Sequence, residues 1–291
     1  MKLVTFEDKA GSGLGVLDDG AVVDLRGVAG VPAGMIELIE AGAPAMDAVR
    51  AAVTGGGKRL SLDGVRLSAP IPVPRRNIFC VGKNYHDHVG EMHRSGFDPK
   101  TSEAPQFPVI FTKSPGCVIG PDAEIPGHLD PTASVDYEAE IAVIIGKPGR
   151  GIKAGDAWKH IFGYTMFNDV TARILQRQHL QWFIGKSIDG FGPMGPCIVT
   201  SDEIGDVAEL DFSLTVNGEQ RQHGVASGMI FDIPSVIETL SRTMRLEAGD
   251  VIATGTPSGV GMGFTPPRFL KKGDVVEIVS PRIGTLRNTV G

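Results

Sequence analysis

Short apolar runs rich in β-branched and aromatic residues recur along the chain from residue 77 onward, and many of them end at Gly, Asn or Asp. Runs of this kind predict strands that are at least half buried. The Asn217-Gly218 dipeptide inside one run is a hairpin signal, so that run is expected to fold back on itself. The predicted strands are 77–82, 107–113, 138–146, 161–169, 196–201, 211–222, 251–255 and 275–280.

Helical periodicity is rare in the same region. Residues 234–244 place Val236, Ile237, Leu240 and Met244 on one face after an early proline. Many strands at irregular intervals, with little helix, fit a mixed sheet rolled into a sandwich or barrel better than a doubly wound parallel sheet. The predicted fold class is therefore α/β in the broad sense, and more closely a strand-rich α+β fold whose main domain is a mixed β-sandwich or β-roll.

The beginning of the chain has the pattern of a small α+β unit. Residues 4–9 and 14–25 predict strands, with a turn at 18–20 inside the second run. Residues 32–53 have apolar positions at mixed helical spacing and predict a helix that is broken near Gly42 and Pro44.

A proline-rich stretch separates this unit from the strand-rich region. Residues 69–76, APIPVPRR, hold the backbone extended, and the larger unit is expected to begin at Asn77. We therefore predict a small N-terminal domain over residues 1–72 and a catalytic domain over 73–291.

Composition and charge exclude several classes of protein. The chain has 42% hydrophobic and 21% charged residues, typical of a globular protein, and no apolar run approaches the ~20 residues of a membrane helix. A net charge of −6 with scattered basic residues argues against nucleic-acid binding. No secretory signal is evident, so a cytoplasmic location is expected, with Cys80, Cys117 and Cys197 as reduced thiols without an assigned role.

Two glutamates lie at the start of an apolar run, VDYEAEIAVIIG, residues 135–146. Side chains alternate along a strand, so Glu138 and Glu140 should point to the same side. If that side is buried, one carboxylate takes up a proton or a cation lies between the two. The alternative is that the strand begins in solvent and both glutamates are hydrated, which is the better interpretation of an isolated pair.

Asp169 follows the predicted strand 161–169 and adds a third carboxylate. An aspartate at a strand end often only caps the next turn. Together with the two glutamates, however, it makes an all-oxygen ligand set, which favours Mg²⁺ or Mn²⁺, whereas zinc prefers His or Cys.

The segment VGKNYHDHVGEMHRSG, residues 81–96, carries three histidines. If residues 87–92 form a helical turn, His88 and Glu91 meet on one face, and Glu91 could orient the imidazole of a general base. The alternatives are a zinc site made from His86, His88 and His93, or hydrated loop histidines. Residues 93–108, which are rich in Gly, Pro and polar residues, have the composition of a mobile lid.

Two more segments could bind anions. Lys186 stands beside aromatic and glycine-rich sequence, where a partly buried ammonium group could meet an anion, although most lysines are simply exposed. Residues 250–264, DVIATGTPSGVGMGF, end a strand in a glycine loop that lacks the P-loop signature. Thr256 and nearby amides of this loop could bind a carboxylate or an oxyanion.

Together these segments resemble the fumarylacetoacetate hydrolase family over residues 77–291. The motifs that carry the resemblance occur in the family's order and are GKNYHDHVGEM, VDYEAEIAVIIGK, GYTMFNDVTAR, GKSIDGFGPMGP, VNGEQRQHG and GDVIATGTPSGVG. The resemblance implies the catalytic domain of that family and a homodimer.

The resemblance also assigns residues. It implies metal ligands at Glu138, Glu140 and Asp169 and a His-Glu dyad at His88 and Glu91. It also implies an active-site lysine at Lys186, substrate-contacting residues at Arg173 and Gln176, and a loop threonine at Thr256. Asp87 resembles an additional ligand of some relatives. The chain departs from many members at Ile174, where an acidic residue is expected after the arginine.

The function implied is metal-dependent hydrolysis of a carbon–carbon bond in a β-diketo acid of the acylpyruvate type, such as fumarylpyruvate, maleylpyruvate or a fumarylacetoacetate-like compound. The cation would bind the 2-oxo and carboxylate oxygens of this small keto acid, and His88 with Glu91 would deprotonate the attacking water. Lys186 and the cation would stabilise the pyruvate enolate that leaves. The alternative is an oxaloacetate decarboxylase, or a tautomerase or isomerase such as a 2-hydroxyhepta-2,4-diene-1,7-dioate isomerase, because these reactions also pass through an enolate. A binding protein without catalytic activity is a further reading.

Overall fold

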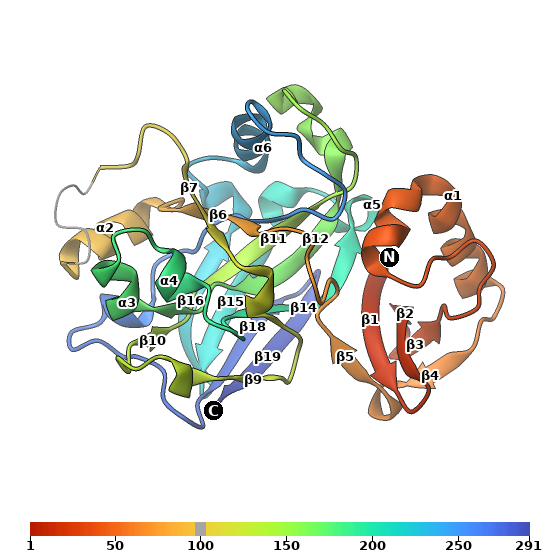
Figure 1. Cartoon of the computed structure of the whole chain (residues 1–291), viewed down its shortest axis with the longest axis horizontal. Helices are drawn as coiled ribbons and strands as arrows, with labels where there is room; N and C mark the ends of the chain where they lie inside the picture. Colours follow the sequence, from red (N-terminus) through yellow and green to blue (C-terminus); the bar gives the residue numbers. More distant parts are fainter. Residues whose placement is uncertain (97–102) are drawn as a thin grey trace.

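The computed structural model of the chain describes residues 1–96 and 103–291. Of the lid predicted over 93–108, residues 97–102 lie outside the described part. Figure 1 shows a strand-rich body flanked by a smaller unit that contains the N-terminus. Among the described residues, no helix has both the length and the apolar character needed to span a bilayer.

The larger unit is built from two main sheets. One continuous sheet has the order β4-β3-β2-β1-β14-β12-β11-β17-β6-β7, with β5 beside β1 and β8 beside β14. Its strands outside the N-terminal unit are β6 Ile78–Gly82, β7 Val109–Lys113, β8 Val118–Ile119, β11 Ala139–Ile145, β12 Ile161–Asn168, β14 Gly192–Thr200 and β17 Val251–Ala253.

The second sheet has the order β16-β15-β18-β19-β9, and a two-stranded ribbon joins β10 to β13. Their bounds are β9 Glu124–Ile125, β10 Val135–Asp136, β13 Thr171–Ala172, β15 Asp211–Val216, β16 Glu219–Val225, β18 Val275–Ser280 and β19 Gly284–Val290. Asn217 and Gly218 form the hairpin turn between β15 and β16, as predicted. Parallel pairs occur beside antiparallel ones, for example β6 with β17, so the sheets are mixed and the strand-rich α+β fold is confirmed.

β11 lies at the centre of the fold and is buried on both faces. Ile141 and Val143 belong to a core cluster that includes Leu214 and Ile278 of the second sheet. On the other face Ala142 packs in a second cluster with Cys80, Phe167 and residues of the N-terminal unit. Burial on both faces explains why the run after Glu140 is continuously apolar instead of alternating.

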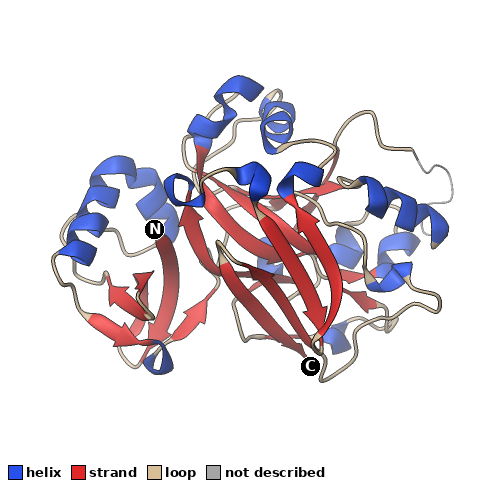
Figure 2. Ribbon diagram, turned by 180° about the vertical axis from the view of Figure 1, so that it is seen from behind, coloured by secondary structure: helices blue, strands red, loops and turns tan. Residues whose placement is uncertain are grey.

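Figure 2 shows helix packed beside the strands of the N-terminal unit. The elements are β1 Lys2–Asp8, β2 Gly11–Asp18, β3 Ala21–Asp24, α1 Met35–Thr54, β4 Arg59–Ser61 and β5 Arg66–Ser68. The predicted break in the helix is present, because Gly42 has a φ of 63° and a ψ of −143°. β1 pairs with β14 of the larger unit through Leu3 and Ile198, so one sheet runs across the predicted boundary. The division at residue 72 stays a prediction.

The remaining helices are short and lie among the loops of the larger unit (Figure 1). They are α2 His86–Arg94, α3 Arg173–Gln178, α4 Phe183–Lys186, α5 Ser201–Ile204 and α6 Ile233–Ser241. α6 corresponds to the helix predicted over 234–244. The three cysteines are free and buried, and burial raises the pKa of Cys117 to about 11 and that of Cys197 to about 12.

Candidate active site

Three buried carboxylates meet at the ends of β11 and β12. Glu138 directly precedes β11, Glu140 is its second residue, and Asp169 directly follows β12. The backbone N–H of Asp169 donates to the carbonyl of Glu138 at 2.9 Å, which aligns the two strand ends. One oxygen from each carboxylate lies within 4.8 Å of those of the other two. The predicted shared face is confirmed, and the hydrated alternative is wrong because none of the three is more than 5% exposed.

Two buried lysines contact this carboxylate group. Lys186 Nζ donates to Glu138 Oε2 at 2.7 Å and to Asp169 Oδ2 at 2.6 Å. Lys113 Nζ, at the end of β7, donates to Asp169 Oδ1 at 2.7 Å and to the carbonyl of Val170 at 2.9 Å. Sequence reasoning identified Lys186 but missed Lys113, whose one signal was a charged residue ending the apolar run 107–113.

Glu140 differs from its neighbours because it makes no ion pair among the described residues. Its Oε2 accepts a hydrogen bond from the backbone N–H of Gly255 at 2.8 Å. Burial raises the pKa of Glu140 well above its usual range, and the charges of Asp169 and Glu138 raise it further. An extra positive charge at this point would stabilise the ionised carboxylate. Three carboxylates with one lacking a counter-charge fit a hard divalent cation.

Glu138 shows the opposite balance. Burial alone would raise its pKa, but the charges of Arg173 and Lys186 outweigh this effect and hold the pKa below its usual range. Arg173 Nη1 lies 2.5 Å from Glu138 Oε1. Glu138 is therefore an ionised carboxylate whose two oxygens are already oriented by cations.

The predicted His-Glu pair forms on α2. His88 Nδ1 lies 3.0 Å from Glu91 Oε2, and the other oxygen of Glu91 accepts from the backbone N–H of Gly259 at 2.9 Å. A carboxylate can only accept hydrogen bonds, so Nδ1 carries the hydrogen and Nε2 is left with a free lone pair. This tautomer is the one that a general base requires.

The neighbouring polar residues of α2 do not join the site. His86 and Asp87 are exposed. Among the described residues, the only group of three or more His, Cys, Asp or Glu side chains close enough to hold a metal is Glu138, Glu140 and Asp169. The alternative zinc site made from histidines is therefore wrong, and the structure places Asp87 outside the carboxylate group.

Arg173 begins α3 and is 3% exposed. Its Nε donates to Asp136 Oδ2 at 2.8 Å, and its Nη1 donates to Gln176 Oε1 at 3.3 Å. Its Nη2 is buried and has no hydrogen-bond partner within the described part of the chain. A buried donor without a partner costs about 1–3 kcal/mol, so this atom is available to an incoming oxygen. Ile174 is exposed and uncharged, and the acids that hold Arg173 are Asp136 and Glu138.

The glycine loop that follows β17 uses its amides on carboxylates of the protein itself. Gly255 N–H binds Glu140, Gly259 N–H binds Glu91, and the N–H groups of Gly261 and Met262 bind Asp136. These amides are occupied by internal carboxylates, and binding of an external anion by this loop stays a prediction. Thr256 Oγ1 accepts from Gln222 Nε2 at 2.8 Å, which leaves its hydroxyl hydrogen free to donate.

A cavity of about 20 Å³ brings most of the predicted residues together. It is lined by His88, Glu138, Glu140, Arg173, Gln176, Lys186 and Thr256, with Lys83, Phe111 and Trp182 among its further walls. Glu91 and Asp169 stand behind this lining. Room of this size suffices for an ion or one water molecule, so binding of a larger ligand requires the walls to move apart.

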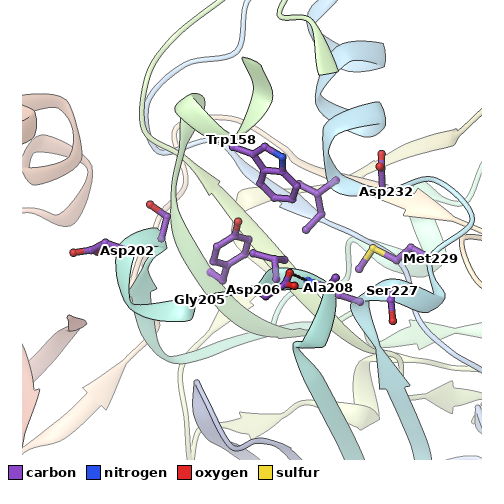
Figure 3. A pocket seen from close by; sticks show the side chains of 13 residues that line it. Trp158, Asp202, Gly205, Asp206, Ala208, Ser227, Met229 and Asp232 are labelled. Atoms are coloured by element: carbon purple, nitrogen blue, oxygen red, sulfur yellow. Dashed lines mark hydrogen bonds between the residues drawn. The ribbon is translucent and has the colours of Figure 1, made fainter. Parts of the chain in front are cut away.

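A much larger pocket, of about 640 Å³, lies elsewhere, and Figure 3 shows its lining. Trp158, Met229 and Ile233 give it apolar walls, and its acidic residues are Asp202, Asp206 and Asp232. None of the predicted site residues is among the described residues that line it. Size alone would therefore point to the wrong part of the molecule.

Comparison with known proteins identifies the family of the chain. A family model for the C-terminal domain of fumarylacetoacetate hydrolase matches residues 77–291. The chain is 52% identical over 236 residues to the oxaloacetate tautomerase YisK of Bacillus subtilis, an alignment that covers 81% of this chain and 76% of that protein.

Two solved structures share the fold along the whole chain. A fumarylacetoacetate hydrolase from Exiguobacterium antarcticum is 43% identical with a TM-score of 0.85, covering 100% of this chain and 99% of the other. A maleylpyruvate hydrolase from Sphingobium sp. SYK-6, in complex with manganese(II) and pyruvate, is 31% identical with a TM-score of 0.81 and covers 100% and 98%. The match over residues 77–291 and these likenesses agree with the motifs and with the buried carboxylate group, and the chain belongs to the fumarylacetoacetate hydrolase family.

Proposed function

We propose that this chain is a divalent-metal-dependent tautomerase that interconverts the enol and keto forms of oxaloacetate or a closely similar keto diacid. The observation that carries the proposal is the placement of His88, oriented by Glu91, on the same small cavity as Glu138 and Glu140. The 52% identity to an oxaloacetate tautomerase supports this reaction over the carbon–carbon hydrolysis expected from the motifs.

The reaction needs a proton to leave the 2-hydroxyl oxygen of the enol and a proton to arrive at C3, with no change in composition. His88 Nε2 is the free base on the cavity, so it accepts the proton at one of these atoms and returns it at the other. Arg173 Nη2 and Gln176 bind the carboxylate of the substrate, and Lys186 places a positive charge beside the oxygen at C2. A divalent ion, Mg²⁺ or Mn²⁺, held by Glu138, Glu140 and Asp169, supplies Lewis-acid polarisation when bound.

Hydrolysis of an acylpyruvate is the second candidate. The likeness to a maleylpyruvate hydrolase whose structure holds manganese and pyruvate favours it. The same His88 would then deprotonate a water molecule instead of the substrate. Decarboxylation of oxaloacetate would use the same charges around the enolate without any base.

One experiment separates the three reactions. Enol oxaloacetate is added to the protein with Mn²⁺, with Mg²⁺ or with a chelator, and the loss of enol absorbance is followed in the ultraviolet. We expect the absorbance to decay faster only with metal, while total oxaloacetate, assayed by enzymatic reduction, stays constant. Release of carbon dioxide would instead indicate decarboxylation. Cleavage of acylpyruvates with heavy oxygen from water in the acid product, together with an uncatalysed enol decay, would replace the proposal by hydrolysis.

Assembly and location stay predictions. A homodimer is testable by light scattering of the purified chain. The predicted partner is the small keto-acid substrate, with no nucleic acid or membrane partner, and a cytoplasmic location is predicted as well.

A further inference from the structure

Asp136 is a buried carboxylate that sequence reasoning did not select, although it lies in the segment that carries Glu138 and Glu140. It is 0% exposed and accepts four hydrogen bonds. The donors are the backbone N–H groups of Tyr137, Gly261 and Met262 and the Nε of Arg173, at 2.9, 2.7, 3.0 and 2.8 Å. Its oxygens are taken up by donors of the protein itself, so its position is fixed.

This carboxylate determines where the guanidinium of Arg173 can lie. The group is planar, and contacts at two of its nitrogens are enough to fix its orientation. Asp136 holds Nε and Glu138 holds Nη1. Nη2, the remaining nitrogen, is buried without a partner among the described residues. Its direction is therefore set by Asp136 as much as by Glu138.

The same loop also holds the acid–base pair. Gly259 N–H binds Glu91, two residues before the amide of Gly261 that binds Asp136. Glycine is required for these approaches, because a Cβ at Gly261 would lie 2.6 Å from Asp136 Oδ1 and one at Gly263 would lie 2.0 Å from Glu91 Oε1. Residues 259–263 thus form a common support for Glu91 and Asp136.

We propose that Asp136 is a positioning residue, which fixes Arg173 against the loop 259–263 so that the anion-binding arginine and the His88–Glu91 pair keep one relative placement. Asp136 is not among the described residues that line the cavity, so it acts through Arg173. The inference rests on the proposed function only in that the ligand of Arg173 is a carboxylate.

The test is a double-mutant cycle read by binding instead of turnover. Oxalate, a small dicarboxylate, is titrated by calorimetry into the Mn²⁺-loaded wild type and into Asp136→Asn, Arg173→Lys and the double variant. We expect Asp136→Asn to raise the oxalate Kd by about 10- to 100-fold in the wild type and by less than about 2-fold when Arg173→Lys is already present. The proposal would be overturned if the fold increases in Kd of the two single variants multiply in the double variant. It would also be overturned if Asp136→Asn leaves the Kd unchanged.

A matched control distinguishes positioning from a general loss of stability. Asp250 is also a buried carboxylate that binds an arginine, Arg76, and a backbone N–H, that of Glu247, but it lies outside the cavity. Asp250→Asn should lower the melting temperature and leave the oxalate Kd within about 2-fold of the wild type. If Asp136→Asn does not fold, Asp136→Glu replaces it in the same double-mutant cycle. This variant keeps a carboxyl group but displaces its oxygens by one methylene.

Failure of this inference and failure of the proposed function give different results. Coupled oxalate binding in a protein that does not tautomerise oxaloacetate would keep the role of Asp136 and reject the reaction. If the protein tautomerises oxaloacetate but the fold increases in oxalate Kd multiply in the double variant, only the role of Asp136 is rejected.

Discussion

The pocket beside Trp158 and the cavity beside His88 contrast in size and in chemistry. The larger, of about 640 Å³, has apolar walls from Trp158 and Met229, acidic groups such as Asp206, and no basic residue among the described residues that line it. The smaller, of about 20 Å³, is lined by both signs of charge, including Glu138, Glu140, Arg173 and Lys186.

The contrast indicates that buried charge is a better guide to the chemistry of a cavity than its volume. Burying ionisable groups is costly unless each is paired or binds a cation, so a dense buried cluster requires a compensating use. Asp206 in the larger pocket instead accepts from the backbone N–H of Ala208, an ordinary helix cap. The volume of a pocket measures room, whereas the buried charges of the smaller cavity indicate reactivity.

The largest effect should follow from removal of the carboxylate that lacks a counter-ion. Glu140→Gln should weaken Mn²⁺ binding by about 10²-fold or more and reduce enol turnover to the chelator-treated level. In the presence of chelator the same variant should melt no lower than the wild type, because a neutral amide replaces a buried carboxyl group that makes no ion pair within the described part of the chain. Calorimetric titration and thermal melts measure both quantities. Full metal affinity in Glu140→Gln would show that the ion binds elsewhere.

The base should come next in size. His88→Ala should lower turnover by about 10²-fold or more while Mn²⁺ affinity stays within about 2-fold, because the imidazole moves protons and does not belong to the carboxylate group. His86→Ala, on the exposed face of the same helix, is the matched control and should behave as the wild type. Wild-type turnover in His88→Ala would exclude it as the base.

Lys113 should contribute less, through Asp169. Lys113→Met keeps most of the length of the side chain but removes the hydrogen bond to Asp169 Oδ1, and we expect Mn²⁺ affinity to fall by about 10-fold. The exposed Lys159→Met is the control, with no change expected in Mn²⁺ affinity. An affinity identical to that of the wild type in both variants would show that Lys186 alone orients Asp169.

The smallest effect should belong to the larger pocket. Trp158 is 48% exposed, and Trp158→Ala should leave enol turnover and Mn²⁺ affinity within about 2-fold of the wild type. Kinetics at saturating and limiting substrate measure this. A loss comparable to that of His88→Ala would remove the distinction between the two cavities.

The sequence predicted those parts of the site that depend on local spacing. Glu138 and Glu140 share a face because strands have a period of two, and His88 and Glu91 meet because helices bring positions three apart together. The hairpin at Asn217-Gly218 and the break at Gly42 followed from the same kind of local rule.

Contacts between distant segments could not be predicted in this way. The role of Asp136 depends on amides 125 and 126 residues further along the chain, and no periodicity relates them. Lys113 ends a strand, and only the packing of β12 decides that its ammonium group turns inward to Asp169. The choice between hydrolysis and tautomerisation was beyond the motifs as well, because both reactions use the same carboxylates, base and lysine.

The proposed function requires a divalent cation held by Glu138, Glu140 and Asp169. The most direct test is anomalous diffraction from crystals of the protein grown with Mn²⁺. We predict one strong peak per chain, at about 2.1 Å from an oxygen of each of the three carboxylates. Crystals with saturating Mn²⁺ that show no peak there, or a peak beside other residues such as His86 and Asp87, would contradict it.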